Sequence, residues 1–276
     1  MLKQEIDAKY RSFALKQSSR LFCLLFNFRS LILRTEVKMT IQENNLFKVS
    51  PRETWHYLQD VPSRIFVEKF HNYVNYSNGL HKRAQSLAQS YLLNRVTFFD
   101  GDLVVDCGAN VGDLKLFFDF EKIAIEYVGI EPSLKTFECL RQNVYPAEVH
   151  NVALSDKTEI SQFFISEANA DSSLIEPVKY EKRVDIKAIR LDEMMNRRIK
   201  LLKVEAEGAE IEVLRGATGL FELIDWITVD VGFERGVNRQ STLVDVTNLL
   251  YGYGYELVDF GYPRLTLLFC HRSSLI

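Results

Sequence analysis

Short β-rich apolar runs alternate with helical segments over residues 102–270, and this alternation constrains the fold more than any other feature of the chain. Strand–helix alternation predicts a mostly parallel sheet with helices on both faces. The last two runs, Tyr255–Phe260 and Arg264–Cys270, are joined by a segment with glycine and proline, so they predict an antiparallel hairpin. Ligands of such sheets bind at the carboxyl ends of the strands, and functional residues are therefore expected in the turns at that edge.

The individual elements follow from the apolar spacing. We expect strands at Leu103–Val105, Glu126–Ile130, Val149–Leu154, Lys200–Val204 and Trp226–Val231, and helices at Asp113–Glu121, Ser133–Asn143, Ile211–Leu223 and Thr242–Leu250. An insertion at 157–198 adds two extended runs, Glu159–Ile165 and Arg183–Arg190. Residues 39–95 are expected to be helical, since Pro51–Trp55 has the pattern of a helix start and Leu80–Leu93 has helical apolar spacing.

These patterns divide the chain into three segments: residues 1–38, a helical cap or lid at 39–95, and a ligand-binding α/β domain at 96–276. The first segment carries eight basic and three acidic side chains. On a helical wheel, most basic residues of 11–38 lie opposite most apolar ones, as in a helix on an anionic membrane surface. A helix packed on the domain, or an extension upstream of a start at Met39, is the alternative.

Composition excludes several classes of protein. The apolar run Leu21–Leu33 is shorter than the ~20 residues of a spanning helix, and no small-residue cleavage site follows it. Lys plus Arg (34) nearly balance Asp plus Glu (37), and no basic cluster lies beyond the first segment, so we expect no nucleic-acid partner. The four cysteines lie far apart, which indicates reduced thiols and a cytoplasmic location, with peripheral membrane contact through 11–38 as an addition.

A glycine turn follows the first predicted strand, with the sequence Asp106-Cys107-Gly108-Ala109-Asn110-Val111-Gly112. A dinucleotide fingerprint would require glycine at 108, 110 and 113, and two of these positions are Asn and Asp, so an NAD site is not favoured. The D-x-G-x-N-x-G spacing resembles motif I of class I S-adenosyl-methionine methyltransferases. Glu131, at the end of the second strand, is placed to accept hydrogen bonds from both ribose hydroxyls of such a cofactor. A turn with an N-capping Asp is the alternative.

We accordingly expect S-adenosyl-methionine as cofactor. Its candidate contacts are the residues of the glycine turn and of the next two strand ends: Asp106, Gly108, Ala109, Asn110, Gly112, Glu131, Pro132, Ala153 and Ser155.

A longer set of blocks extends this resemblance. They are Asp106–Gly112, Glu131–Ser133, Leu140–Val144, Asn151–Asp156, Asp171–Leu174, Leu191–Glu193 and, most specifically, Leu201–Ala217. With them the stretch 73–271 resembles the FkbM family of methyltransferases. The resemblance implies a class I methyltransferase Rossmann-like fold, with a mostly parallel seven-stranded sheet, a C-terminal antiparallel hairpin and, in this chain, an N-terminal helical extension. It also implies methylation, usually of a hydroxyl, in polyketides or in sugars of glycans. Glu205 stands where the family usually has Asp.

Carboxylates at the fourth and fifth strand ends are the catalytic candidates: Glu205, Glu207 and Asp230. A hydroxyl is a poor nucleophile, so a general base or a metal should assist. If the fourth strand continues through residue 207, Glu205 and Glu207 share a face and their repulsion raises the pKa of one of them. The three carboxylates could instead hold a divalent metal. The alternative for Glu207 and Glu210 is favourable charge in the first turn of a helix.

Contacts to the acceptor are expected from two places. Glu234 and Arg235 follow the fifth strand, with a surface ion pair as the alternative. Tyr76, Asn78 and Arg83 precede the domain and would form a lid, with packing as the alternative. The family resemblance thus implies an O-methyltransferase, and we expect its acceptor to be a sugar hydroxyl of a glycan or glycolipid. The hydroxyl of a polyketide or another small molecule, and a non-catalytic cofactor-binding module, remain as alternatives.

Overall fold

The computed structural model describes residues 37–42, 45–49, 56–60, 63–67, 75–76, 78–166 and 172–274. The chain forms two compact units, Met1–Leu80 and His81–Ile276. The helix α2 (Leu80–Ser90) belongs to the second unit except for its first residue.

The described part of the first unit is a β-sheet. Its strands are β1 (Val37–Gln42), β2 (Asn45–Val49), β3 (His56–Asp60) and β4 (Ser63–Val67), paired antiparallel in that order. The expectation of helix is therefore wrong for these strands, although it is confirmed for α2. The physical reason is visible in β1, where apolar and polar residues alternate with the period of two that defines a strand. The expected helix start at Pro51–Trp55 lies outside the described residues, as do residues 1–36 of the basic segment.

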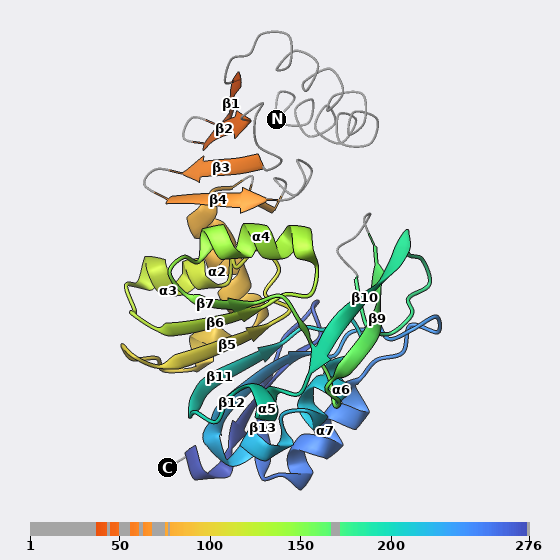
Figure 1. The fold of residues 1–276 in the computed structure, drawn as a ribbon. Coiled ribbons are helices and arrows are strands. Elements are labelled where there is room, and N and C mark those ends of the chain that lie inside the picture. Colours follow the sequence, from red (N-terminus) through yellow and green to blue (C-terminus); the bar gives the residue numbers. More distant parts are fainter. Residues whose placement is uncertain are drawn as a thin grey trace. The chain divides into compact units, whose positions relative to one another are not determined.

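The second unit is built on a seven-stranded sheet with the order β13-β14-β12-β11-β5-β6-β7 (Figure 1). Five strands run parallel: β5 (Leu103–Cys107), β6 (Glu126–Ile130), β7 (Glu148–His150), β11 (Ile199–Val204) and β12 (Ile224–Asp230). The hairpin of β13 (Tyr255–Phe260) and β14 (Thr266–His271) completes the sheet, with β14 antiparallel to β12. This order confirms the predicted class I methyltransferase fold.

Helices cover both faces of this sheet (Figure 1). One face carries α2, α3 (Lys115–Glu121) and α4 (Leu134–Asn143), and the other carries α5 (Leu191–Met194), α6 (Glu210–Arg215) and α7 (Leu243–Gly252). The strands are apolar on both sides because each contributes to two cores. Val104 and Leu201 pack toward α2 and α3, whereas their neighbours Val105 and Leu202 pack toward α6 and α7.

The insertion forms a smaller sheet of its own. Its strands are β8 (Ala153–Leu154), β9 (Glu159–Ile165) and β10 (Lys182–Ile189), in the order β8-β10-β9. The expected strand Val149–Leu154 is thus divided between two sheets. The expected helix Ile211–Leu223 is also divided, into α6 and the 3-10 helix η3 (Thr218–Leu223). Gly216 lies at that break, where a Cβ would come within 1.9 Å of the carbonyl oxygen of Ser155.

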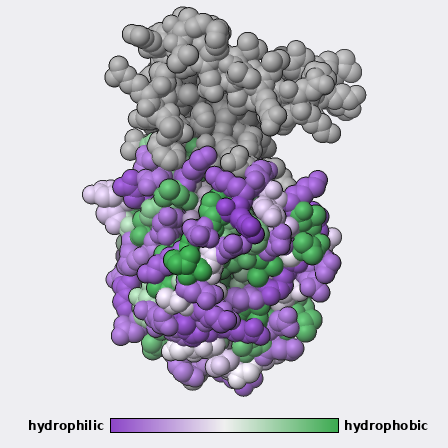
Figure 2. All heavy atoms as spheres, turned by 45° about the vertical axis from the view of Figure 1, so that its right-hand side comes forward, coloured by the Kyte–Doolittle hydropathy of each residue, from purple (hydrophilic) through white to green (hydrophobic). Residues whose placement is uncertain are grey.

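On the face of the second unit shown in Figure 2, hydrophobic side chains form separate patches among hydrophilic ones. Within the described ranges, no helix is both long enough and apolar enough to cross a membrane.

Candidate active site

The glycine turn connects β5 to α3, and its backbone requires glycine at two positions. Gly108 has φ of +69°, and a Cβ there would lie 1.9 Å from the carbonyl oxygen of Glu205. Gly112 has φ of +81°, and its Cβ would lie 2.5 Å from a methyl carbon of Val144. Asn110 is also left-handed, with φ of 50°, a conformation that Asn tolerates better than most side chains. The glycine spacing seen in the sequence is therefore imposed by close packing around the turn.

Glu131 follows β6 directly, and its carboxylate reaches the glycine turn. The backbone N–H of Asn110 donates to its Oε2 at 3.0 Å, and the N–H of Ser133 donates to its Oε1 at 2.8 Å. Burial raises the pKa of Glu131 to about 7, although these two hydrogen bonds act in the opposite direction. Each carboxylate oxygen keeps a further lone pair, and vicinal hydroxyls are suitable donors to such a pair of oxygens. The donor set and the glycine turn thus fit the adenosine part of the expected cofactor.

Asp106 lies beneath the turn and not at its surface. Its carboxylate is fully buried, accepts a hydrogen bond from the hydroxyl of Tyr127 at 2.7 Å and pairs with the ammonium of Lys203 at 2.9 Å. The structure therefore gives Asp106, which we expected to contact the cofactor, the position of a support for the turn.

Lys203 links this support to the turn itself. Its ammonium donates to the carbonyl oxygen of Gly108 at 2.7 Å and to that of Cys107 at 3.2 Å. Burial by itself lowers the pKa of Lys203, but the charges of Asp106 and Tyr91 oppose this effect, and the pKa is raised to about 12. A permanently charged ammonium therefore holds the two carbonyl groups of the turn in place.

Glu205 lies one residue beyond β11 and has three polar partners. It accepts a hydrogen bond from the hydroxyl of Tyr91, pairs with Lys203 at 3.2 Å and pairs with the guanidinium of Arg264. The ring of Tyr91 has both cations near it, each 5.1 Å from the ring centroid. Burial raises the pKa of Tyr91, and Lys203 partly opposes that shift. The site therefore joins the end of α2, the end of β11 and the β13–β14 turn.

Asp230, the last residue of β12, belongs to the same cluster. Its carboxylate accepts hydrogen bonds from Nε of Arg264 at 2.5 Å and from the N–H of Gly232 at 3.0 Å. Burial raises its pKa to about 6. Arg264 thus connects Glu205 with Asp230, two of the three carboxylates singled out from the sequence.

Glu207 is not on a common face with Glu205. The strand β11 ends at Val204, and Glu207 adopts a left-handed backbone with φ of 51°. The premise that the fourth strand runs through residue 207 is therefore wrong, because the chain turns away from strand geometry before that residue. The actual partner of Glu205 at the period of two is Lys203.

The cluster does not suit a divalent metal. Arg264 already pairs with Glu205 and with Asp230, and Lys203 pairs with Glu205 as well. A metal ion coordinated by these carboxylates would have to displace both side-chain cations. Across 78–166, 172–274 and the shorter described ranges, no three His, Cys, Asp or Glu side chains form a metal-type group.

Glu210 is buried and bound by hydrogen bonds to the loop before α6 and to Thr242. Its Oε1 accepts hydrogen bonds from the N–H groups of Ala206 and Gly208 at 3.1 and 2.9 Å, and its Oε2 accepts one from Thr242 at 3.1 Å. These bonds fix the loop before α6, and Glu210 lies in the first turn of that helix as the alternative interpretation required.

Arg235 is committed to the same loop. Its guanidinium forms two hydrogen bonds to Glu212, at 2.8 and 2.6 Å, and one to the carbonyl oxygen of Gly208 at 2.5 Å. Hydrogen bonding to Glu212 raises the pKa of Arg235. The ion pair named as the alternative for Arg235 is thus present. Glu234 precedes it in the β12–α7 loop and is partly exposed.

The three expected lid residues are placed differently. Tyr76 is buried and Asn78 is exposed, and both belong to the first unit. Arg83 lies on α2 in the second unit and pairs with Asp113 at 2.8 Å. Their contact with an acceptor stays a prediction.

The remaining expected cofactor residues lie at the ends of β6 and β8. Asn151, which the sequence did not single out, donates to the backbone oxygens of Glu131 and Pro132 at 2.9 and 3.0 Å. Ala153 is buried in β8, where it pairs with Ala188 of β10. Asn151 thus fixes the chain next to Glu131.

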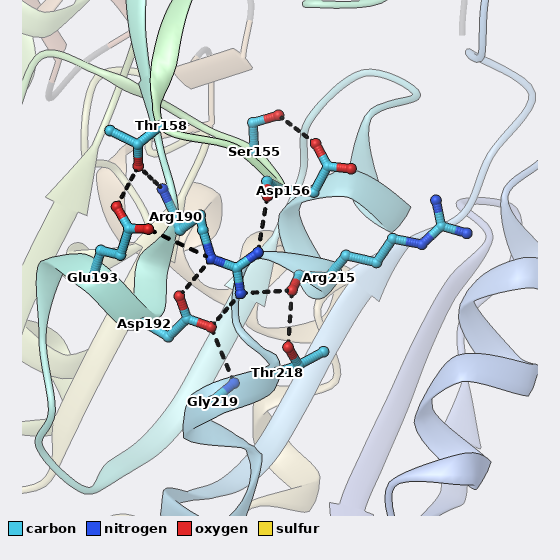
Figure 3. Close-up of polar contacts among 9 residues, drawn as sticks. All are labelled: Ser155, Asp156, Thr158, Arg190, Asp192, Glu193, Arg215, Thr218 and Gly219. Atoms are coloured by element: carbon cyan, nitrogen blue, oxygen red, sulfur yellow. Dashed lines mark hydrogen bonds and ion pairs between the residues drawn. The ribbon is translucent and has the colours of Figure 1, made fainter.

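Ser155 lies beside a polar cluster around Arg190 that attaches the insertion to the domain (Figure 3). The guanidinium of Arg190 binds Asp192 through two bonds of 2.8 and 2.5 Å, the carbonyl oxygen of Asp156 at 2.8 Å and that of Arg215 at 3.3 Å. The Ser155 hydroxyl approaches Asp156 at 3.4 Å (Figure 3). Because Arg190 directly follows β10 and Arg215 ends α6, this cluster attaches the small sheet to a helix that packs on the large one.

Comparison of the sequence with known proteins identifies methyltransferases as its relatives. A family model described as "Methyltransferase FkbM domain" matches residues 106–257. "Methyltransferase 1" of Beauveria bassiana is 26% identical over 201 residues, covering 62% of this chain and 80% of that protein. The "31-O-demethyl-FK506 methyltransferase FkbM" of Streptomyces tacrolimicus is 24% identical over 206 residues, covering 61% and 78%.

Among solved structures, methyltransferase FkbM from Methylobacillus flagellatus is similar, with a TM-score of 0.49 and 18% identity. The match covers 73% of this chain and 52% of that protein, so the chain spans about half the length of that relative. The family model itself covers more than half of this chain and includes the glycine turn, Glu131, Lys203, Glu205 and Asp230, whereas Tyr91 and Arg264 lie outside the matched residues. The chain therefore belongs to the FkbM family of methyltransferases.

Proposed function

We propose that this protein transfers a methyl group from S-adenosyl-methionine to a hydroxyl oxygen, and that the hydroxyl belongs to a sugar of a glycan or glycolipid. The observation that best supports S-adenosyl-methionine as the cofactor is the hydrogen bond from the N–H of Asn110 to Glu131 at 3.0 Å. This bond unites the two motifs that were recognised separately, the glycine turn and the acidic strand end. A backbone that approaches closely and a carboxylate for the ribose then lie in one place.

The residues divide the work between cofactor and acceptor. Bound S-adenosyl-methionine supplies a methyl group activated by a sulfonium. Gly108 lets the turn pack against the carbonyl group of Glu205, Glu131 orients the ribose, and Lys203 holds the turn through its carbonyl groups. Glu205, the most exposed carboxylate of its cluster, takes the proton of the acceptor hydroxyl. Tyr91 and the cations around Glu205 fix its orientation, so that the acceptor is held in line with the methyl group.

Exposed aromatic residues near the cluster support an acceptor with an apolar face. Phe233 follows β12, and Phe260 and Tyr262 belong to the hairpin; they are 69%, 64% and 90% exposed. The pairing of Asp230 with Thr266 places the β13–β14 turn at the carboxyl end of β12, where Glu205 and Arg264 also meet. Aromatic faces beside polar, hydrogen-bonding side chains suit a sugar ring. They also suit a polyketide, the second candidate, which the name of the Streptomyces tacrolimicus relative favours.

The first test is calorimetric titration of the full chain with S-adenosyl-homocysteine. We expect binding that Glu131→Ala weakens at least about tenfold, the equivalent of one charge-assisted hydrogen bond. Glu138→Ala is the matched control, because Glu138 forms only an exposed ion pair with Arg141 on the neighbouring helix. Well-folded protein that does not bind would refute the cofactor.

The second test is transfer of a labelled methyl group to panels of sugar and polyketide hydroxyls. Turnover with one panel assigns the acceptor class, whereas binding without turnover on either panel favours a non-catalytic module. Transfer to nitrogen or carbon would contradict the O-methyltransferase proposal.

Residues 11–38 are also part of the proposal, as a peripheral contact with an anionic membrane surface. Their basic and apolar residues separate on a helical wheel, although Lys38 itself lies in β1. Co-sedimentation with anionic vesicles should decrease when residues 1–36 are deleted, and equal co-sedimentation of both forms would refute this contact.

A further inference from the structure

The acidic and basic side chains at the carboxyl ends of β5, β11 and β12 form one continuous series. Asp106 pairs with Lys203 at 2.9 Å, Lys203 with Glu205 at 3.2 Å, Glu205 with Arg264, and Arg264 with Asp230 at 2.5 Å. We call these five residues the charge series. Three carboxylates share two cations, so the charge series carries one excess negative charge.

The groups packed around the charge series do not neutralise this excess. Tyr91 donates to Glu205 and Tyr127 donates to Asp106, and burial raises the pKa of both hydroxyls. Burial also raises the pKa of the Cys107 thiol, to about 12. The buried carboxyl groups of Glu131 and Glu210 accept hydrogen bonds from backbone N–H groups and add to the negative potential where they are ionised. A cation at this edge of the sheet would therefore be stabilised.

The members of the charge series differ in their access to solvent. The side chain of Glu205 is 18% exposed, whereas those of Asp106 and Asp230 are 1% and 2% exposed. Lys203 and Arg264 keep their charges at neutral pH, because the pKa of Lys203 is about 12 and a guanidinium does not lose its proton in proteins. Glu205 is therefore the carboxylate of the charge series that a bound ligand can reach most readily.

We propose that the charge series keeps the site electrically balanced during methyl transfer: its excess negative charge balances the sulfonium of the cofactor before transfer, and a proton taken up at Glu205 replaces that positive charge afterwards. This inference rests on the proposed function. It adds a role for the other four members of the charge series, Arg264, Asp230, Lys203 and Asp106. With ionised Glu205 they give the charge series a net charge of minus one, which one positive charge neutralises.

The atoms and charges of this step balance. The acceptor oxygen forms a bond to the methyl carbon, the bond between that carbon and sulfur breaks, and its electron pair stays on the sulfur. The hydroxyl proton moves to the carboxylate of Glu205. One positive charge leaves the sulfur and one arrives on Glu205, so the buried site holds the same net charge before and after. In surroundings of low dielectric, this avoids the free-energy cost of an uncompensated charge.

Binding measurements can detect the effect without any acceptor. The homocysteine product lacks the sulfonium charge, so its complex should hold a proton at Glu205 that the methionine complex lacks. The experiment is calorimetric titration of the full chain with S-adenosyl-methionine and with S-adenosyl-homocysteine, in buffers of different ionisation enthalpy near pH 7. We expect the homocysteine form to take up more protons, by up to about one, and the ratio of the two Kd values to change by up to about tenfold per pH unit.

Two variants locate the proton. Glu205→Gln should abolish the difference in proton uptake between the two cofactor forms. Glu256→Gln, the same change at an exposed residue paired with Arg272 on the hairpin, should leave the difference intact. Thermal unfolding of each variant verifies that it is folded.

The outcomes separate the two proposals. Equal proton uptake for both cofactor forms in the unmodified chain overturns the charge-balance inference and leaves the methyltransferase proposal standing; this comparison needs no variant. A difference that persists in folded Glu205→Gln overturns the assignment to Glu205. Failure of both forms to bind overturns the proposed function itself.

Discussion

Replacing Lys203 by Met would remove the ammonium that connects the glycine turn to the two carboxylates beside it. The side chain is 3% exposed and contacts Asp106 at 2.9 Å, Glu205 at 3.2 Å and the carbonyl oxygen of Gly108 at 2.7 Å. Met fills a similar volume, so the change removes charge and hydrogen bonds while leaving little empty space. Asp106, which is fully buried, would lose its only cation among the contacts described above.

The magnitude can be worked out from the ionisation of Lys203. Its pKa is raised from 10.5 to about 12, which corresponds to about 2 kcal/mol in favour of the folded state. Because the pKa is higher in the folded state, this contribution is complete below pH 10.5 and disappears as the pH rises through about 12. Loss of one partner from a buried ion pair typically costs about 3–5 kcal/mol. We therefore expect Lys203→Met to lower the free energy of unfolding by about 3–5 kcal/mol at pH 7.

Urea denaturation measures this loss. Lys200→Met is the matched control on the same strand, since Lys200 is partly exposed and lies 3.9 Å from Asp225; we expect it to cost less than about 1 kcal/mol. The double variant Lys203→Met/Asp106→Asn should lose less than the sum of the two single variants, because neither charge is then left unpaired. A loss below about 1 kcal/mol for Lys203→Met, or strict additivity with Asp106→Asn, would refute the reasoning.

Three further predictions test other parts of the fold. Gly108→Ala should destabilise the protein by about 3 kcal/mol and abolish binding of S-adenosyl-homocysteine, because its Cβ would lie 1.9 Å from a carbonyl oxygen. Gly101→Ala is the control for the backbone cost of about 1–2 kcal/mol, because Gly101 has φ of +87° and nothing lies within 4 Å of its Cβ position. Equal losses of unfolding free energy for the two variants would contradict the steric argument. Gly252→Ala, at the exposed end of α7 with nothing within 4 Å, should stabilise the protein by about 0.5–1 kcal/mol, and a lower melting temperature would disprove this. Burial raises the pKa of Glu131 from 4.5 to about 7, so the unfolding free energy should decrease by about 3 kcal/mol as the pH rises through this interval. If the wild type and Glu131→Gln showed the same dependence of unfolding free energy on pH, this prediction would be wrong.

The fold of the second unit could be predicted because its strands and helices differ strongly in pattern. Strands such as β5 are apolar without interruption since both of their faces are buried, whereas the helices between them keep one polar side. The prediction of helix is wrong for the strands of the first unit because it extends the pattern of a helix start at Pro51–Trp55 and the helical spacing of Leu80–Leu93 over the whole of 39–95. The alternation in Val37–Gln42 was present in the sequence and indicates a strand.

The candidate site was only partly predictable. Gly108 and Glu131 follow predicted strands directly, so their position at the sheet edge comes from local sequence. Tyr91 and Arg264 come from the end of α2 and from a hairpin turn, and only the tertiary fold brings them to Glu205. Lys203 lay inside a recognised block without an assigned role. The end of β11 at residue 204 decides its pairing with Glu205, and the position of a strand end is among the features that sequence specifies least.

The antiparallel hairpin explains why the acceptor is harder to predict than the cofactor. The carboxyl ends of parallel strands lie at one edge of the sheet, so the topology alone places the glycine turn and Glu131 at that edge. The strand β14 runs in the opposite direction, so it is the turn before it that reaches this edge and brings Arg264 to Glu205 and Asp230. A turn can change its length and its exposed side chains without disturbing strand pairing. Under the proposed function, residues positioned by the sheet hold the cofactor, and the acceptor meets the turn before β14. Substitutions at Tyr262, which is 90% exposed in that turn, should then change the choice of acceptor more than the affinity for the cofactor.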